Sequence, residues 1–349
     1  MKSGVLKINL AAIVNNWRHL RNKTTPKTCT AAVVKANAYG LGVKQVSQAL
    51  WTAGARTFFV SSVDEAIEIR SMIPKTATVY YFNGYSPTDN DSIIEHDIIP
   101  MLNSPEQIYD FSLQDLRKAV GIQVDIGINR LGIKRTEFLK YKKLIKNNML
   151  SIMVGHLSSA DDSYATETES QYSEFLKFSA LFPAVPKSLA ATGGILLGDK
   201  YHFDVTRPGI GLYGGHPFKG AEPVLSLNLP VIQIKTIKRF EGVGYNHTFK
   251  ARKSMRIAVV VSGYADGLSR KLSNRGFLYY GSIKCAIVGR ISMDLITVDI
   301  SALPNDPVTL QIIGLSQSID DLAKQLGTIG YEILTSLGSR YERVYHTEL

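Results

Sequence analysis

The first 215 or so residues alternate between short apolar runs of strand character and longer segments whose apolar residues recur with a helical period. Eight apolar runs predict strands at Thr30–Val34, Thr57–Ser62, Ala77–Phe82, Ile98–Leu102, Gly121–Ile126, Ser151–His156, Lys187–Ala191 and Phe203–Thr206. Helical segments such as Val63–Met72 and Glu167–Phe178 fall between them. This alternation predicts an α/β fold, an N-terminal (β/α)₈ barrel of the TIM type, with a doubly wound parallel sheet as the structural alternative.

The pattern changes from about Phe218, where short alternating segments are separated by Gly, Asn and Ser turns. These segments predict a mainly β domain. One helical segment stands out at Ser318–Gly327, because it begins with a Ser cap and carries acidic residues in its first turn. We therefore expect two domains, a barrel over residues 1–217 and a mainly β domain over residues 218–349.

Composition narrows the class of protein. The 349 residues are 45% hydrophobic, which excludes a disordered chain. Lys and Arg number 40 against 30 Asp and Glu, a net charge of +10, but these residues are dispersed, so we expect no nucleic-acid partner. Cys29 and Cys285 give neither a disulfide framework nor a metal-ligand pattern. The apolar run Leu10–Val14 is too short for a signal-peptide core, and no run approaches a membrane span, so we expect a cytoplasmic protein.

Polar residues follow the predicted barrel strands where each strand ends. They are Lys35, Arg130, His156, Thr192 and Arg207. A single polar residue in such a place usually just enters solvent, but five on one rim predict a functional site there. Lys35 is the sharpest candidate, because an apolar strand delivers it to the rim and the small residues after it leave room around its amine. A desolvated lysine can act as a nucleophile.

The segment around Lys35, AAVVKANAYGLG, resembles the pyridoxal-phosphate lysine motif of the alanine racemases. Further blocks resemble that family in the same order: VDIGINRLGI, GHLSSADD, FDVTRPGIGLYG, VGYNHTF, GYADGLSR, VGRISMD and YEIL. The resemblance covers essentially the whole chain, so it is far more specific than one lysine motif.

The resemblance implies a pyridoxal 5'-phosphate enzyme that interconverts L-alanine and D-alanine and supplies D-alanine for peptidoglycan. It implies that Lys35 forms the Schiff base and is the base for the D-enantiomer. Tyr245 of the partner subunit would be the base for the L-enantiomer, and a chain through His156 to Arg207 would favour its ionised form. The resemblance therefore also implies a homodimer with shared active sites.

Further roles follow from the same resemblance. Arg207 would face the pyridine nitrogen and, because arginine hardly ever loses its proton, leave that nitrogen unprotonated. The substrate carboxylate would meet Arg130 and the backbone N–H of the partner subunit's Met293. Tyr264 would gate the site, although a packed tyrosine is an equal alternative. The residues implied to hold the phosphate are Tyr39, Thr192, Gly209, Ile210 and Tyr331.

The run Gly209–Gly214 also satisfies G-x-G-x-x-G, the dinucleotide-binding fingerprint. That fingerprint must follow a first strand and open a helix. Here Pro208 precedes the run, and a second proline, Pro217, follows closely after it. We therefore interpret these glycines as exposing backbone N–H groups to a phosphate at the end of the last barrel strands.

Four positions depart from the family pattern. Leu41 replaces a usual histidine, Ala191 a usual asparagine, and Asn246 the glycine that often follows the catalytic tyrosine. Gln123 occupies the position at which many members carry a carbamylated lysine that steadies the substrate arginine. An amide cannot be carbamylated, so we predict activity that does not depend on bicarbonate, with Arg130 either steadied by a neutral group or held less firmly.

Several alternatives remain open from the sequence. A racemase of broader or different specificity, such as one for serine, would share all these motifs. Amino-acid decarboxylases of the same fold carry a late cysteine motif that is missing here. A non-catalytic pyridoxal-phosphate carrier would share the barrel but lack the second domain. We expect alanine as the small-molecule partner, no membrane partner and no metal.

Overall fold

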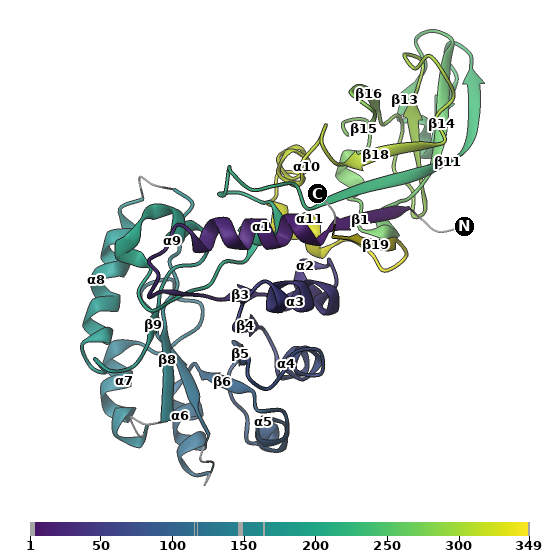
Figure 1. The fold of residues 1–349 in the computed structure, drawn as a ribbon. Coiled ribbons are helices and arrows are strands. Elements are labelled where there is room, and N and C mark those ends of the chain that lie inside the picture. The colour runs from purple at the N-terminus through teal and green to yellow at the C-terminus, as the bar shows by residue number, and fades with distance from the viewer. Residues whose placement is uncertain (1–3, 115, 117, 146–148, 163–164, 348–349) are drawn as a thin grey trace. The chain divides into compact units, whose positions relative to one another are not determined.

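The computed structural model describes residues 4–347 except 115, 117, 146–148 and 163–164. The chain divides into two compact units. One is Ile13–Glu222, and the other combines Met1–Ala12 with Pro223–Leu349. Figure 1 shows the elements of both units along the chain.

The unit Ile13–Glu222 is built on parallel strands. They are β2 (Cys29–Thr30), β3 (Ala32–Val33), β4 (Thr57–Val60), β5 (Thr78–Tyr81), β6 (Ile99–Leu102), β7 (Val120–Gln123), β8 (Leu150–Val154), β9 (Lys187–Ser188) and β10 (Val205–Thr206). Strands β3 to β9 pair in chain order as one sheet. Each of the eight predicted strands overlaps an observed one.

The sheet closes on itself through β10. Strands β2 and β3 are separated by Ala31 alone and occupy one strand position. β10 pairs with β2 in parallel, and on its other side an isolated bridge joins Ala191 to Arg207. The Arg207 N–H donates to the Ala190 carbonyl at 2.8 Å, and the Ala31 N–H donates to the Thr206 carbonyl at 2.9 Å. Eight strand positions therefore form a closed barrel, which confirms the predicted (β/α)₈ fold and excludes the open, doubly wound alternative.

Helices follow most of the barrel strands, and Figure 1 shows α3 to α8 arranged around them. The helices are α1 (Leu10–Arg21), α2 (Lys35–Tyr39), α3 (Val43–Thr52), α4 (Val63–Arg70), α5 (Asn90–His96), α6 (Pro105–Ser112), α7 (Arg135–Tyr141), α8 (Glu167–Ser179) and α9 (Thr192–Leu197). Two begin with serine caps: Ser62 accepts from the Glu65 N–H and Ser104 from the Gln107 N–H. These caps satisfy donors that the first helical turn leaves unpaired.

The second unit is mainly β, as predicted. Its strands are β1 (Val5–Asn9), β11 (Leu225–Ile237), β12 (Gly242–Val243), β13 (Phe249–Lys250), β14 (Met255–Val261), β15 (Phe277–Tyr280), β16 (Ile283–Ala286), β17 (Leu295–Asp299), β18 (Thr309–Ile313) and β19 (Glu342–His346). The long strand β11 pairs with β1, β14 and β18, so it joins the two halves of an eight-stranded sheet. The helices are α10 (Ile319–Leu326) and α11 (Gly330–Thr335).

Strand β1 was not predicted, and it lies in the second unit's sheet rather than in the barrel. It pairs antiparallel with β11, where Val5 lies opposite Asn228, and parallel with β19, where Val5 lies opposite Glu342. The predicted helix at Ser318–Gly327 is confirmed as α10. Ser318 caps it, and Gly327 ends it with a φ of 68°, which glycine adopts without strain.

Candidate active site

The five polar residues singled out from the sequence all follow barrel strands. Lys35 comes two residues after β3, His156 two residues after β8, and Arg207 directly after β10. Thr192 opens α9, and Arg130 lies in the loop that follows β7. Since the carboxyl ends of parallel strands meet at one rim, the closed barrel carries all five at the same end.

Lys35 is followed by an unusual stretch of backbone. Ala36 to Tyr39 are all left-handed, with φ between 52° and 54°. This conformation costs non-glycine residues roughly 1–2 kcal/mol each, so surrounding contacts must hold it. The Asn37 carboxamide oxygen accepts from the Val43 N–H at 2.7 Å, and the Tyr39 ring stacks on Tyr213 with centroids 4.5 Å apart. The turn that directly follows the lysine is therefore strained, and contacts of Asn37 and Tyr39 hold it.

The rim is strongly cationic. Burial lowers the pKa of Lys35, and the positive charge of Arg130 lowers it further, while Glu65 raises it. Burial, together with the charges of Arg207, Arg130 and Lys35, lowers the pKa of His156 to about 3. At neutral pH His156 is therefore an uncharged imidazole, able to donate from one ring nitrogen and accept at the other.

Arg207 is almost completely buried, with 3% of its surface exposed. Its guanidinium donates to the Gly155 carbonyl at 2.8 Å and to the Ser188 hydroxyl. Burial lowers its pKa to about 9, so it is still a cation at neutral pH. Both partners are neutral, and no carboxylate pairs with Arg207 among the described residues. A buried cation without a counter-charge favours an anionic or electron-rich ligand.

A second feature of the rim is a set of backbone donors around Thr192. The Thr192 hydroxyl accepts from the N–H groups of Gly209 and Gly211, each at 3.2 Å. A Cβ on Gly209 would overlap the Tyr39 hydroxyl, and one on Gly211 would lie 2.6 Å from the Thr192 methyl group. The structure thus brings together Tyr39, Thr192 and the Gly209 backbone, which were implied to hold a phosphate.

The glycine run does not form a dinucleotide turn. Gly209 precedes a short 3₁₀ helix, η5 (Ile210–Tyr213), which ends at the left-handed Gly214. Thr206 ends β10 three residues before Gly209. A four-residue 3₁₀ turn cannot supply the long helix of the dinucleotide fold, in agreement with the interpretation from the sequence.

The loop of Arg130 is held through its backbone. The Asp125 carboxylate accepts from the N–H groups of Gly127, at 3.0 Å, and Asn129, at 3.1 Å. The buried Gln123 donates from its amide to the Leu131 carbonyl at 3.2 Å. Gln123 therefore steadies the backbone next to Arg130, whose side chain is exposed.

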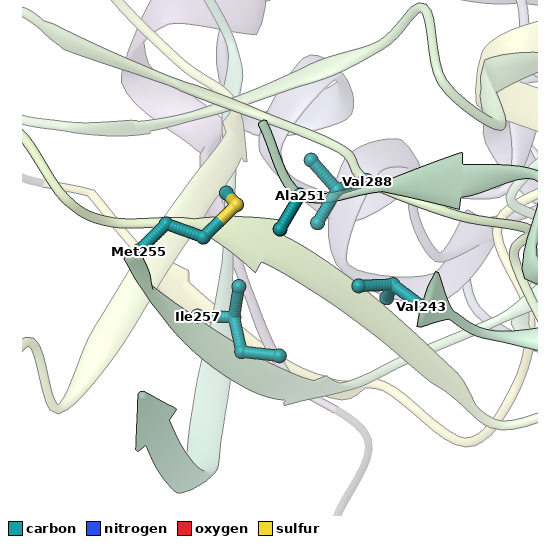
Figure 2. Close-up of a cluster of buried hydrophobic side chains, with 5 residues drawn as sticks. All are labelled: Val243, Ala251, Met255, Ile257 and Val288. Atoms are coloured by element: carbon teal, nitrogen blue, oxygen red, sulfur yellow. The ribbon is translucent and has the colours of Figure 1, made fainter. Parts of the chain in front are cut away.

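The remaining candidate residues lie in the second unit. Tyr245 opens the 3₁₀ turn η6 (Tyr245–His247) between β12 and β13, and 67% of its surface is exposed. Val243 of β12 and Ala251, which follows β13, belong to a cluster of buried apolar side chains, as Figure 2 shows with Met255, Ile257 and Val288. Asn246 takes a φ of 59°, a left-handed conformation that asparagine tolerates better than most residues. Asn246 thus preserves a turn in which glycine would be unstrained.

Met293 and Tyr264 are carried by two loops that bond to each other. The Tyr264 N–H donates to the Ser292 carbonyl at 3.2 Å, and the Ala265 N–H to the Met293 carbonyl at 3.1 Å. Below them the fully buried Asp266 accepts two hydrogen bonds from the Arg340 guanidinium, at 2.7 and 2.8 Å. Tyr331 lies on α11 and is exposed.

Two groups of this region were missed from the sequence. One is Glu65, whose carboxylate contacts the backbone next to Lys35, and whose signal was the pattern Ser-x-x-Glu at Ser62. The other is the Asp266–Arg340 pair, for which the sequence offers no signal because the partners lie far apart along the chain.

The described residues offer neither a metal site nor a membrane span. No group of three or more His, Cys, Asp or Glu side chains in this part of the chain could hold a metal ion. Nor does any helix described here have the length and hydrophobicity to cross a membrane.

Comparison with known proteins gives concordant results. Residues 8–217 match the family model of the alanine racemase N-terminal domain, and residues 224–345 that of the C-terminal domain. An alanine racemase of Cereibacter sphaeroides is 46% identical, with 99% of each chain covered. The structure of an alanine racemase from Bartonella henselae with covalently bound pyridoxal phosphate is 34% identical, with a TM-score of 0.92 over 99% of this chain and all of that one. The biosynthetic enzyme of Pseudomonas aeruginosa is 30% identical, also with a TM-score of 0.92 and the same coverage. This chain belongs to the alanine racemase family.

Proposed function

We propose that this protein is an alanine racemase that interconverts L-alanine and D-alanine with pyridoxal 5'-phosphate and supplies D-alanine for peptidoglycan. Membership of the family supports this over both domains of the chain. The observation that carries the proposal within the structure is the rim of the barrel. There Lys35, neutral His156 and buried cationic Arg207 follow the strands β3, β8 and β10 of one closed sheet.

The residues at the rim fit the cofactor. Its phosphate matches the Thr192 hydroxyl, whose oxygen accepts from the Gly209 and Gly211 N–H groups and whose own proton can be donated, and the Tyr39 hydroxyl, in a place that a Cβ at residue 209 would fill. Its ring nitrogen, as an electron-rich acceptor, matches Arg207, which has only neutral partners among the described residues. Lys35 has the lowered pKa that covalent attachment of an aldehyde requires.

Racemisation requires removal of the weakly acidic Cα proton on one face and its return on the other. Pyridoxal phosphate, when bound, supplies the electron sink for this step. The protein supplies the two bases. On one face the Lys35 amine takes the proton or its ammonium returns it, and on the opposite face the Tyr245 phenolate of a second subunit takes the proton or its hydroxyl returns it.

Arg130 binds the substrate carboxylate, and the Met293 N–H of the partner subunit donates a further hydrogen bond to it. His156 is neutral and near a cationic Arg207, so it can accept from Arg207 or pass a proton along a hydrogen-bond chain without adding charge.

We further propose a homodimer with shared active sites. Tyr245 and Met293 are 67% and 53% exposed, yet each lies on a turn that its own unit holds tightly. A well-ordered turn that presents an exposed tyrosine is suited to complete a site on another chain.

The test of the function begins with the cofactor. The purified holoenzyme should absorb near about 420 nm, and borohydride reduction should abolish the band and leave the label on Lys35. Turnover should then be measured on a panel of L-amino acids that includes alanine and serine. Label on another lysine, or no turnover of alanine by labelled protein, would contradict the proposal. The latter result would point to a non-catalytic carrier, and a preference for serine to a racemase of different specificity.

The shared site is tested by mixing variants. Lys35→Ala and Tyr245→Phe are each expected to be nearly inactive, but hybrid dimers would contain one intact site and recover part of the activity. Lys44→Ala mixed with Lys35→Ala is the matched control, because Lys44 is exposed on α3. If subunit exchange is demonstrated and no activity returns, the shared-site proposal is wrong.

A further inference from the structure

Glu65 lies in the first turn of α4 and reaches the backbone next to Lys35. One carboxylate oxygen accepts from the Ala36 N–H at 2.6 Å, and the other from the Ser61 N–H at 2.7 Å. Ala36 directly follows the lysine, and Ser61 directly follows β4. The carboxylate therefore ties together the ends of two adjacent barrel strands, β3 and β4, at the position where Lys35 leaves the sheet.

An equivalent position two strands further along shows what a helix cap alone requires. Helix α6 also begins with a serine cap, Ser104, and Gln107 occupies the position that Glu65 has in α4. The Gln107 carboxamide oxygen accepts from the Asn103 N–H at 2.7 Å, just as Glu65 accepts from Ser61. A neutral amide thus serves the cap at α6, so the cap does not explain why α4 carries a carboxylate.

What distinguishes Glu65 is its second contact and its charge. An amide has a single acceptor oxygen, and its NH₂ group would face the Ala36 N–H with two donors opposed. The turn from Ala36 to Tyr39 is left-handed throughout, so a short hydrogen bond to its first N–H helps to hold a strained conformation.

The charges that act on Lys35 come from several elements. Arg130, in the loop after β7, disfavours the ammonium form, and Glu65 on α4 favours it. His156 after β8 is neutral, and Arg207 after β10 is cationic. Glu65 is the only carboxylate among the described residues that acts on Lys35. Its loss would leave the lysine beside cations without a balancing anion.

We propose that Glu65 is a positioning residue for Lys35: its carboxylate fixes the backbone that follows the lysine and places a negative charge beside the residue that carries the amine. The proposal rests on the proposed function, in which Lys35 carries the cofactor. Glu65 itself touches neither the cofactor nor the substrate in this role.

The test uses Glu65→Gln, with Asp64→Asn as the matched control. Asp64 is exposed, precedes Glu65 in the same helical turn, and its change removes the same charge. Cofactor-free protein is treated with an amine-acylating reagent across a range of pH, and modified Lys35 is quantified by mass spectrometry. Because the anion that favours the ammonium is gone, Glu65→Gln should label at least about threefold faster near pH 8 and show a lower midpoint. Asp64→Asn should match the wild type.

Backbone hydrogen exchange gives a second readout. In Glu65→Gln the Ser61 N–H should stay protected, as the cap at α6 indicates, while the Ala36 N–H should lose protection. Gln107→Glu should change neither Lys35 labelling nor exchange at Ala36.

Three results would overturn the proposal. One is equal labelling profiles for Glu65→Gln and Asp64→Asn, and another is unchanged protection at Ala36. The third is a Glu65→Gln protein that does not fold, because the charge would then be needed for the cap. Failure of the proposed function is a separate result, namely borohydride label on a residue other than Lys35 in the wild type.

Discussion

The candidate residues of the barrel and those of the second unit are built in opposite ways. Arg207 is 3% exposed and its guanidinium bonds within the barrel, while His156 and Lys35 have pKa values lowered by burial and by neighbouring cations. Tyr245 is 67% exposed and Met293 is 53% exposed, with only their backbones held firmly. The barrel thus assembles one side of a site within its own unit, whereas the second unit presents side chains that are free to serve another chain.

The largest expected effect comes from the barrel side. Lys35→Ala removes both the attachment point and one base, and general bases alone contribute about 10²–10⁴-fold. We expect kcat/KM to fall by at least about 10⁴-fold in both directions, measured by coupled assays for each enantiomer. The exposed Lys44→Ala on α3 is the control. A residual activity above one per cent would show that the rim lysine is not essential.

Tyr245→Phe tests an exposed candidate residue of the second unit. Loss of the hydroxyl should lower kcat by about 10²–10⁴-fold, but the melting temperature should not change, because the side chain is exposed and lies outside the buried cluster of Figure 2. Tyr280→Phe, at a tyrosine that is 38% exposed, is the control. A drop in melting temperature with Tyr245→Phe would mean that the hydroxyl supports the fold of its unit.

Gly209→Ala tests whether the space beside Gly209 in the barrel holds the cofactor phosphate. The new Cβ would overlap the Tyr39 hydroxyl and fill the space beside two backbone donors. We expect cofactor affinity to weaken about tenfold, which corresponds to about 1.4 kcal/mol, measured by titration of the cofactor-free protein. Gly220→Ala is a suitable control, because its nearest neighbour would be the Phe218 ring at 3.3 Å. Unchanged affinity would argue against a phosphate at Gly209.

The neutral state of His156 predicts a pH dependence of stability in the cofactor-free protein. Its folded pKa of about 3 lies below the ordinary 6.5, so between these values the unfolded chain binds a proton that the folded chain does not. Stability is therefore lost as pH falls from about 6.5 towards 3, by at most about 1.4 kcal/mol per pH unit from this group.

Denaturant unfolding between pH 4 and 7 measures this slope. His156→Gln should make the free energy of unfolding less dependent on pH, whereas the exposed His19→Gln should not. Parallel pH profiles for wild type and His156→Gln would show that the imidazole becomes charged in the fold.

The smallest expected effect is none at all. Gln123 cannot be carbamylated, and it steadies the loop of Arg130 through the Leu131 carbonyl. Removal of bicarbonate by degassing should therefore leave kcat/KM for alanine unchanged. A fall that bicarbonate restores would reveal a carbamylated lysine elsewhere and would mean that the Arg130 side chain needs an anion to hold it.

Local patterns were enough to predict all eight barrel strands, because each strand lies in a short apolar run between segments of helical or turn character. The helix α10 was predicted for a similar reason, since its Ser318 cap and its Gly327 end are both local signals. The ends of the predicted strands placed Lys35, His156 and Arg207 at one rim, the family resemblance implied their roles, and the structure shows the burial and neighbouring charges that act on them.

The features that were not predicted depend on contacts between distant residues. The left-handed turn after Lys35 has the sequence Ala-Asn-Ala-Tyr, and the absence of glycine gives no local signal for this conformation. The conformation must therefore come from tertiary contacts such as that of Ala36 with Glu65. Likewise, Asp266 meets Arg340 across the second unit. Sequence patterns within a short window carry no information about such pairs.

The strand β1 has a consequence for how the chain folds during synthesis. Its two partners are β11 and β19, and along the sequence all the barrel residues come after β1 and before these partners. Chains fold from the N-terminal side as they emerge from the ribosome. The barrel can therefore fold while β1 is still unpaired, and β1 must wait for the last strand before its second edge is covered. We expect that residues 218–349 expressed alone would expose the edges of β11 and β19 and aggregate, and that supplying Val5–Asn9 through a linker after β19 would suppress this.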